Sequence, residues 1–167
     1  MGFTAAGIAT DTVSTTQLAP LGFVLTAPCA TADAGYCEWV YVFNDEAADD
    51  FAAGMIIYRD PSVTTQDWYG GIIAPVTDHQ PTVTVLGVAQ HAIPDGSYGF
   101  ILQKGVGLIL AGSGGIAADS AFTSGGATDD GSAIIFADDA TATIAVIGHT
   151  ATVIVASVTG TAYINCG

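Results

Sequence analysis

The three histidines, His79, His91 and His149, are the side chains of this sequence best suited to acid–base chemistry near neutral pH. Only His79 has a carboxylate beside it, Asp78. Acyl transfer needs a nucleophile that a base activates and a third group orients, and the chain has no G-x-S-x-G elbow. Neighbours on a strand point to opposite faces, and Pro81 makes a turn the simpler interpretation here. The sequence therefore predicts no catalytic residue and a protein that is not an enzyme.

Adjacent carboxylates could supply oxygen ligands to calcium, which takes about six to eight of them. No such pair lies in a D-x-[DN]-x-[DN]-G loop, so solvated turns are the simpler interpretation. The chain also lacks the histidine and carboxylate spacing of a zinc or iron site, such as H-E-x-x-H. We therefore expect no metal and no cofactor. The acidic pairs are Asp45–Glu46, Asp49–Asp50, Asp129–Asp130 and Asp138–Asp139.

The three cysteines, Cys29, Cys37 and Cys166, lack the paired spacing of a zinc site. Cys29 and Cys37 could face each other across a hairpin and form a disulfide. Small buried thiols in a reducing compartment are the favoured interpretation. The N-terminus, MGFTAAGIATDTV, lacks the basic region and apolar core of a secretory signal, so we expect a protein made in the cytoplasm.

Acidic residues dominate the charge of the chain. Asp and Glu number 16 against two strongly basic residues, Arg59 and Lys104, and the formal net charge is −14. Nucleic acids and anionic membranes are bound through clustered Lys and Arg, so we expect neither as a partner. The acidity is interpreted as a means of keeping a chain that is 50% hydrophobic in solution.

Short runs rich in Thr, Val, Ile and Tyr, each closed by Gly, Pro, Asn or Asp, predict strands over nearly the whole chain. Such strands predict an all-β, single-domain antiparallel barrel or sandwich, and the pattern does not decide between the two. A short helix is expected at Asp45 to Ala53 with Asn44 as its N-cap, although a loop fits equally well. The expected strands are Leu21 to Thr26, Cys37 to Phe43, Met55 to Tyr58, Gly71 to Ala74, Thr82 to Ala89, Tyr98 to Gln103, Gly107 to Leu110, Ala133 to Phe136, Ala142 to Ile147, Thr152 to Val158 and Ala162 to Asn165.

Two segments differ from this pattern. Residues 1–19 have weak periodicity, so we expect an extended N-terminal arm there and the β domain at 20–167. Such an arm can pair with the sheet edge of a neighbouring molecule. Ala111 to Ser132 consists almost entirely of Gly, Ala, Ser, Thr and Asp, and is expected to be a long exposed loop.

The expected strand Thr152 to Val158 has apolar side chains on both faces, with Val153 and Val155 on one of them. Neither face is suited to water, so either both lie inside the domain or another chain covers one. From this we expect an obligate oligomer. Trp39 and Trp68 are expected to be core or interface anchors, because large amphipathic rings bury the most area per residue.

The most distinctive segment runs from Val85 to Ile101, VLGVAQHAIPDGSYGFI. It predicts a hairpin in which one strand ends at Ala92–Ile93, Pro94–Asp95–Gly96 forms the turn and Tyr98 to Leu102 returns as the partner strand. The segment therefore describes fold rather than active chemistry.

This block, followed by Gly105, resembles small virion structural proteins of tailed bacteriophages, particularly marine ones. Those proteins share a pattern that begins with LGVAQ and continues with a small residue before Ile-Pro, a Gly, a Tyr-Gly-aromatic segment and then a further glycine. Leu21–Gly22, Glu38–Val42 and Phe51–Gly54 lie upstream in the expected order. The resemblance covers about residues 20 to 110.

The resemblance implies a head decoration or cement protein on the outer surface of the capsid, often a homotrimer, that ties major-capsid subunits together. A ligand that binds only the mature shell stabilises that shell by mass action. The expected partners are the major capsid protein and copies of the chain itself, through residues that the resemblance does not identify. The alternatives are another virion component (tail, fibre or minor head protein), a secreted β-sandwich binding or adhesion module, and an enzyme.

Overall fold

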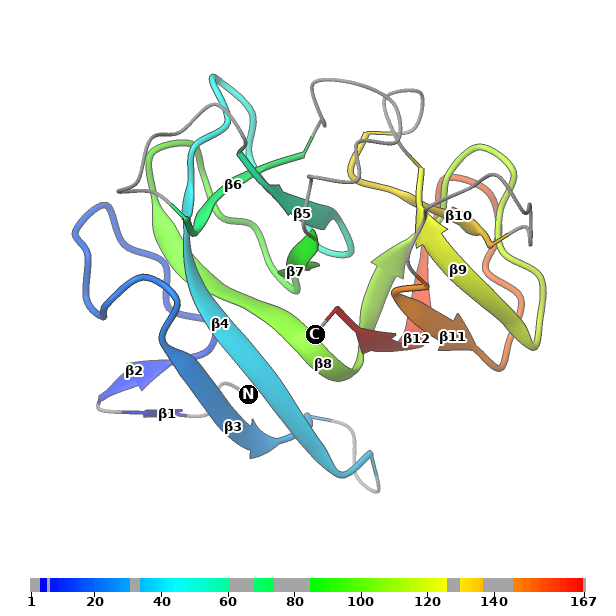
Figure 1. The fold of residues 1–167 in the computed structure, drawn as a ribbon, viewed down its shortest axis with the longest axis horizontal. Helices are drawn as coiled ribbons and strands as arrows, with labels where there is room; N and C mark the ends of the chain where they lie inside the picture. Colours follow the sequence, from blue (N-terminus) through cyan, green and yellow to red (C-terminus); the bar gives the residue numbers. More distant parts are fainter. Residues whose placement is uncertain are drawn as a thin grey trace.

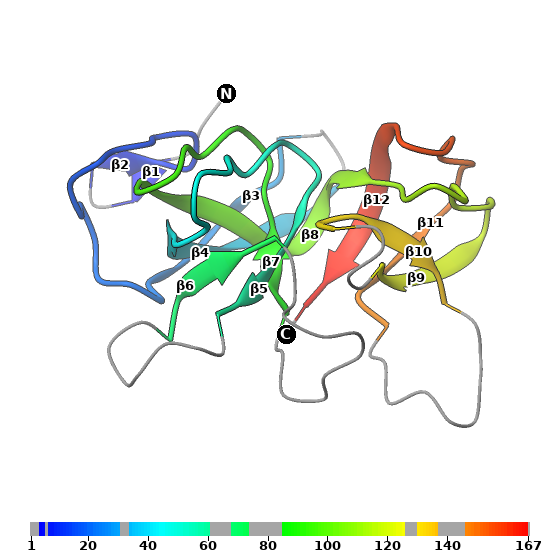
Figure 2. The same ribbon diagram turned by 90° about the horizontal axis from the view of Figure 1, so that it is seen from above.

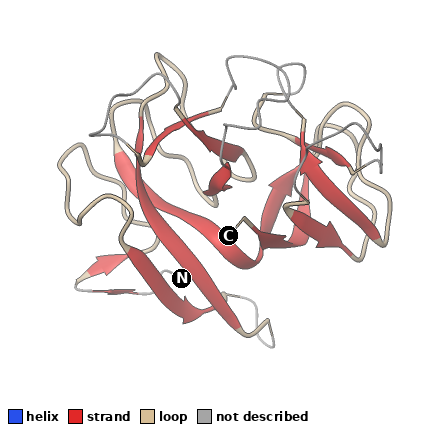
Figure 3. Cartoon of the chain, in the orientation of Figure 1, coloured by secondary structure: helices blue, strands red, loops and turns tan. Residues whose placement is uncertain are grey.

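The computed structural model describes residues 4–5, 7–30, 34–60, 68–73, 85–125, 130–136 and 146–166. Every regular element in these ranges is a β-strand, which confirms the predicted all-β fold (Figure 3). A helix long and apolar enough to cross a membrane is absent from them. The strands are β1 (Thr4–Ala5), β2 (Ile8–Ala9), β3 (Val24–Pro28), β4 (Tyr36–Asn44), β5 (Ile56–Arg59), β6 (Gly70–Ile72), β7 (Val85–Val88), β8 (Tyr98–Leu110), β9 (Ser120–Ser124), β10 (Ala133–Ile135), β11 (Gly148–Thr150) and β12 (Thr159–Asn165).

The first ring of strands has the order β8–β7–β5–β6–β4, and β4 pairs back with β8 (Figure 1). All of its pairings are antiparallel except that of β4 with β6, which is parallel. Closure of this kind leaves no free edge inside the ring and makes it a barrel, the alternative that the sequence pattern alone does not select. A cluster of buried side chains belongs to this ring: Val40, Val42, Phe51, Ile57, Leu86, Ala89, Ile93 and Ile101.

The second ring uses the other half of β8, which pairs with β12, followed by β11, β9 and β10. Ala111, next to the end of β8, forms a parallel bridge with Ala133 of β10, and the Gly112 N–H donates to the Ala133 carbonyl at 2.8 Å. This bridge connects β10, the last strand of the second ring, back to the end of β8, the strand on which the ring begins. The two rings lie side by side (Figure 2). Buried side chains of the second ring are Ile109, Ile116, Phe122, Ile147, Ile154 and Ile164.

β8 belongs to both rings and changes its partner near Gly105. Lys104 pairs with Glu38 of β4 and with Asn165 of β12. Gly105 has a φ of 126°, where side chains are rarely accommodated, and a Cβ there would lie 2.5 Å from the Cys37 Sγ. Glycine is therefore required where the strand passes from one ring to the next. One cluster of buried residues extends through both rings, so they share a core.

The predicted strands at Tyr98 to Gln103 and Gly107 to Leu110 are one continuous strand, β8. The predicted turn after Ile93 is confirmed, with the Ser97 N–H donating to the Pro94 carbonyl at 3.1 Å. β7 ends earlier than expected, at Val88, and only a single bridge to Phe51 lies at Ile93.

The prediction of a long exposed loop at Ala111 to Ser132 is wrong in the described part of that segment. β9 lies within it, and the Phe122 side chain is fully buried. Opposite Phe122 is Gly148, where any Cβ would collide with the Phe122 ring. The small residues around Phe122 therefore belong to closely packed strands.

The predicted helix at Asp45 to Ala53 does not form. The fully buried Asn44 side chain donates to the Ile93 carbonyl at 2.8 Å, and its Oδ1 accepts from the Glu46 N–H at 3.0 Å. These bonds hold the segment as a loop against the turn that precedes β8. Ala48, with a φ of 76°, also interrupts any helix.

Thr152 to Val158 is not a strand, contrary to the prediction. Only Ile154 pairs, in a single bridge with Ile116, and Ser157 turns the chain with a φ of 57°. The premise that this segment has two apolar strand faces is therefore wrong. Its valines lie on a loop. The strand expected at Ala142 to Ile147 lies largely outside the described residues, and 146–147 are not part of a strand.

The N-terminal segment expected as an arm lies, over residues 7–19, on the protein's own sheet. Ile8 is buried with Tyr41 and Phe100 on the outer side of β4 and β8. Ser14 and Tyr98 exchange backbone hydrogen bonds of 3.1 and 2.8 Å. This segment therefore covers an apolar sheet face that would otherwise meet water.

Candidate functional site

The histidines of the described chain lie in different rings. His91, half-buried after β7, has an Nε2 atom without a hydrogen-bond partner in the described part of the structure. Burial lowers the pKa of His91, and the charge of Asp11 opposes this shift. His149 is exposed on β11, opposite Tyr163 of β12. The candidate residues outside the described ranges are Asp78, His79, Asp129, Asp138 and Asp139.

The carboxylates of the 45–50 loop are hydrogen-bond acceptors for nearby backbone groups. Glu46 accepts from the Ile73 N–H at 2.8 Å, and Asp50 accepts from the Asp95 N–H at 3.1 Å. Asp95 accepts in turn from the Ala48 N–H at 3.3 Å. These bonds tie the loop to the end of β6 and to the turn before β8. Within the described ranges, no group of three or more His, Cys, Asp or Glu is placed to hold a metal ion.

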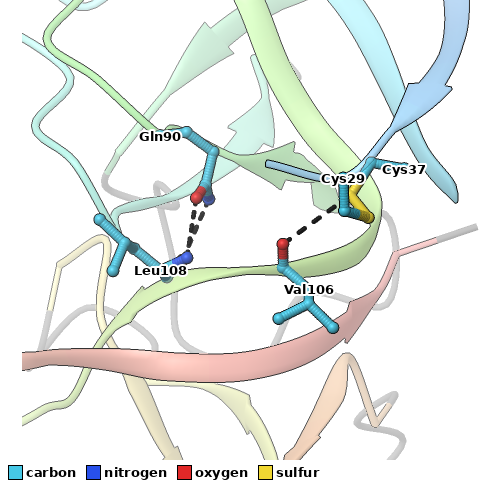
Figure 4. The surroundings of a disulfide bond; sticks show 5 residues. All are labelled: Cys29, Cys37, Gln90, Val106 and Leu108. Atoms are coloured by element: carbon cyan, nitrogen blue, oxygen red, sulfur yellow. Dashed lines mark hydrogen bonds between the residues drawn. A yellow bond between two sulfur atoms is a disulfide. The ribbon is translucent and has the colours of Figure 1, made fainter. Parts of the chain in front are cut away.

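Cys29 and Cys37 form a disulfide, so the expectation of free thiols is wrong for both of them. The pairing of β3 with β4 brings the two cysteines together. The Cys37 Sγ lies 3.8 Å from the Val106 carbonyl oxygen of β8. A disulfide sulfur carries no proton, so this contact, which Figure 4 marks with a dashed line, is a van der Waals contact. Cys166 is a free thiol, and burial raises its pKa to about 12, which keeps it protonated and unreactive near neutral pH.

The side chain of Gln90, from the LGVAQ segment, hydrogen-bonds to the backbone of β8 as a neighbouring strand would (Figure 4). Its Oε1 accepts from the Leu108 N–H at 2.7 Å, and its Nε2 donates to the Leu108 carbonyl at 3.1 Å. Both backbone groups of Leu108 are thereby satisfied on the side away from β12. Gln90 of the LGVAQ segment thus has a structural role.

The two tryptophans have different surroundings. Trp39 on β4 is half-buried against the hydrophobic clusters. Trp68 is 57% exposed, with the guanidinium carbon of Arg59 4.5 Å from its ring centroid and the Arg59 Nε donating to the Trp68 carbonyl at 3.0 Å. One of the two basic residues of the chain is therefore engaged with an aromatic side chain of the same chain.

Two loops lie at the far end of the second ring: residues 112–119 and 151–158 (Figures 1 and 2). We call the apolar surface that their exposed side chains form the valine tip. Ile116 and Ile154 join the loops through backbone hydrogen bonds of 2.8 and 2.9 Å. The side chains on either side of Ile154 point outward: Val153 is 66% exposed and Val155 is 64% exposed. Val158 is 48% exposed.

Charge is nearly absent from the valine tip. Its only charged residue is Asp119, and the sequence carries no Asp, Glu, Lys or Arg between Ala140 and Gly167. Its other exposed residues are small: Ser113, Gly114, Ala117, Ala118, Ala151, Thr152, Ala156 and Ser157. Most described carboxylates instead lie on the first ring and the segments that adjoin it: Asp11, Glu38, Asp45, Glu46, Asp49, Asp50, Asp60 and Asp95.

The valine tip contains residues that the sequence pattern singled out, in a different structural setting. The valines of 151–158 were visible as an apolar run, but their place on a loop depends on the long-range bridge between Ile154 and Ile116. The contribution of 112–119 was not foreseen. The only local signal for it was Ile116, a single large apolar residue among small ones.

Comparison of the chain with protein-family models, with curated proteins and with solved structures finds no match.

Proposed function

We propose that this chain is a head decoration, or cement, protein of a tailed bacteriophage: a non-catalytic protein that binds the assembled capsid from outside. The observation that carries the proposal is the valine tip, an apolar surface with a single charged residue, Asp119, on a chain with a formal charge of −14. Exposed apolar surface of this kind typically marks contact with other proteins, and the centres of protein interfaces are depleted of charge. Together with the phage-like LGVAQ block, this favours a role in assembly over one in catalysis.

Two further features support a place on the outer surface of a virion. The Cys29–Cys37 disulfide suits an oxidising exterior, because disulfides persist on virion surfaces and are rare in the cytosol. The carboxylates of the first ring would face solvent, where like charge keeps crowded particles apart.

The mechanism is linkage between binding and shell stability. A protein that binds only the mature lattice stabilises it in proportion to RT ln(1 + [L]/Kd), and several contacts on one particle increase the effect. No bond is made or broken, so no catalytic group is required.

The test uses particles of the encoding phage that lack this chain. Purified protein is added back, bound protein is measured by co-sedimentation, and genome release on heating is followed with a DNA-binding dye. We expect saturable binding and release at a higher temperature than in the bare particles. Absence of binding, binding only to tails in electron micrographs, or binding without any rise in release temperature would refute the proposal.

A further inference from the structure

Trp68 is a large aromatic side chain that the fold leaves in contact with water. It is more than half exposed, whereas the residues that follow it, Tyr69 to Ile72, are half-buried or buried. Among the described residues from Met55 to Ile73 it is the only exposed large apolar side chain. An exposed indole contributes little to the core, but it offers a ligand a broad apolar face beside polar groups.

Arg59 holds the Trp68 ring in one orientation. The Arg59 guanidinium carbon lies over the ring, 4.5 Å from its centroid, and the Arg59 Nε donates to the Trp68 carbonyl at 3.0 Å. Arg59 is itself fixed by the pairing of β5 with β6, where it lies opposite Gly71. The guanidinium covers one face of the indole and leaves the other for a ligand. Because the ring is already ordered, little freedom is lost when that ligand binds.

Charge restricts the ligands that this face accepts. The formal charge of −14 on the chain repels anions, and Asp60, which follows Arg59, offsets the positive charge of Arg59. A cation is disfavoured for a different reason: Arg59 already makes the cation–π contact, and its charge repels a second cation on the opposite face. The surroundings of Trp68 therefore favour a ligand without net charge.

Polarity restricts the ligand further. A pyranose sugar has a face of C–H groups, which carry partial positive charge and stack on the negative face of an indole. Its hydroxyl groups lie around the edge and accept hydrogen bonds from a guanidinium, of whose five N–H donors the Trp68 carbonyl uses one. A protein partner would instead need a broad apolar centre, and neither β5 nor β6 carries an exposed large apolar side chain.

We propose that Trp68 and Arg59 form a stacking site for an uncharged pyranose sugar. The two residues belong to the first ring, whereas the valine tip lies at the far end of the second ring (Figure 1). The sugar site is therefore separate from the surface that the proposed function uses, and it adds a ligand that this function does not require.

Nuclear magnetic resonance of the isotope-labelled chain tests the proposal, because its two tryptophans, Trp39 and Trp68, give two indole N–H signals. The probes are the methyl glycosides of glucose, galactose, mannose and N-acetylglucosamine. For one or more of them we expect a saturable shift of the Trp68 signal, with a Kd on the order of 1 mM for a ligand of this size, and no shift of the Trp39 signal. Methyl glucuronide and, in slightly acidic buffer, methyl glucosaminide carry opposite charges, and each should bind at least ~5-fold more weakly.

Variants of the two residues separate their contributions. Trp68→Ala should weaken glycoside binding at least ~10-fold, and Trp68→Phe, which keeps a smaller ring, by about 3-fold. Saturation transfer to the glycoside replaces the indole signal as the readout in these variants. Arg59→Gln should admit the cation, so that methyl glucosaminide binds at least ~3-fold more tightly than it binds the wild type. The matched control is Tyr36→Ala, which removes a 72% exposed aromatic side chain on β4 and should bind sugars as the wild type does.

Three results would overturn the proposal: a Trp68 signal that no neutral glycoside shifts, a glycoside affinity that Trp68→Ala leaves unchanged, and equal binding of neutral and charged sugars. Loss of capsid binding in Trp68→Ala, without any response to sugars, would overturn it as well and would identify a protein as the partner of this ring. We expect Trp68→Ala to bind capsids as the wild type does, because the valine tip is a separate surface.

Discussion

Loss of the Cys29–Cys37 disulfide is expected to lower the stability of the whole domain by an amount that the structure allows us to estimate. The bond joins residues separated by 8 positions. In the chain-entropy account, closing a loop of that length raises the free energy of the unfolded chain by about 2.5 kcal/mol at 25 °C, and so stabilises the folded state by this amount. In a domain of about this size, each kcal/mol changes the unfolding temperature by about 2–4 °C, so a decrease of about 5–10 °C is expected.

Differential scanning calorimetry with and without a phosphine reductant measures this decrease. The Cys29→Ser, Cys37→Ser double variant should melt at the temperature of the reduced wild type and should not respond to reductant. Cys166→Ser is the matched control: its thiol is not part of the bond, so this variant should respond to reductant as the wild type does. A wild-type change below about 1 °C, or an equal change in the double variant, would refute the reasoning.

Two further predictions concern side chains with unusual surroundings. Gln90→Ala leaves the N–H and carbonyl of Leu108 without their side-chain partner, so chemical denaturation should show that the free energy of unfolding falls by about 1–3 kcal/mol. The exposed control Gln17→Ala should change it by no more than about 0.5 kcal/mol. Equal losses in the two variants would contradict the strand-like role of Gln90. Burial lowers the pKa of His91 from 6.5, so near this pH the folded state binds fewer protons than the unfolded state. The stability that comes from keeping His91 neutral is therefore fully present above about pH 6.5 and is lost as the pH falls through the pKa of the folded state. His91→Gln should therefore lose less unfolding free energy than the wild type in urea titrations between about pH 7.5 and 5, and an unchanged pH dependence would contradict the burial argument.

The all-β class was predictable because local patterns determine it. Val40 and Val42 face the first ring, whereas Tyr41 points to the opposite face, and the apolar run that results is recognisable as a strand without any knowledge of its neighbours. The turn at Pro94 to Gly96 was equally local, since proline and glycine set its backbone directly.

The features that were missed depend on contacts between residues far apart in the sequence. β9 contains one large side chain among small ones, and it becomes a strand because Gly148 leaves room for Phe122. The helix expected after Asn44 is replaced by a loop because the Asn44 amide reaches Ile93, 49 positions away. The same limit applies to the valine tip: composition revealed its valines, but only the pairing of Ile116 with Ile154 shows which residues lie beside them.

Because β8 is continuous through both rings, it sets the distance between them. Two barrels joined by a flexible linker would sample many separations and orientations. Here the connection is a strand hydrogen-bonded to β4 in one half and to β12 in the other, and backbone bonds such as that between Ile56 and Gly131 hold the halves together elsewhere. Molecules bound at opposite ends of the chain would therefore be held at a set spacing from each other.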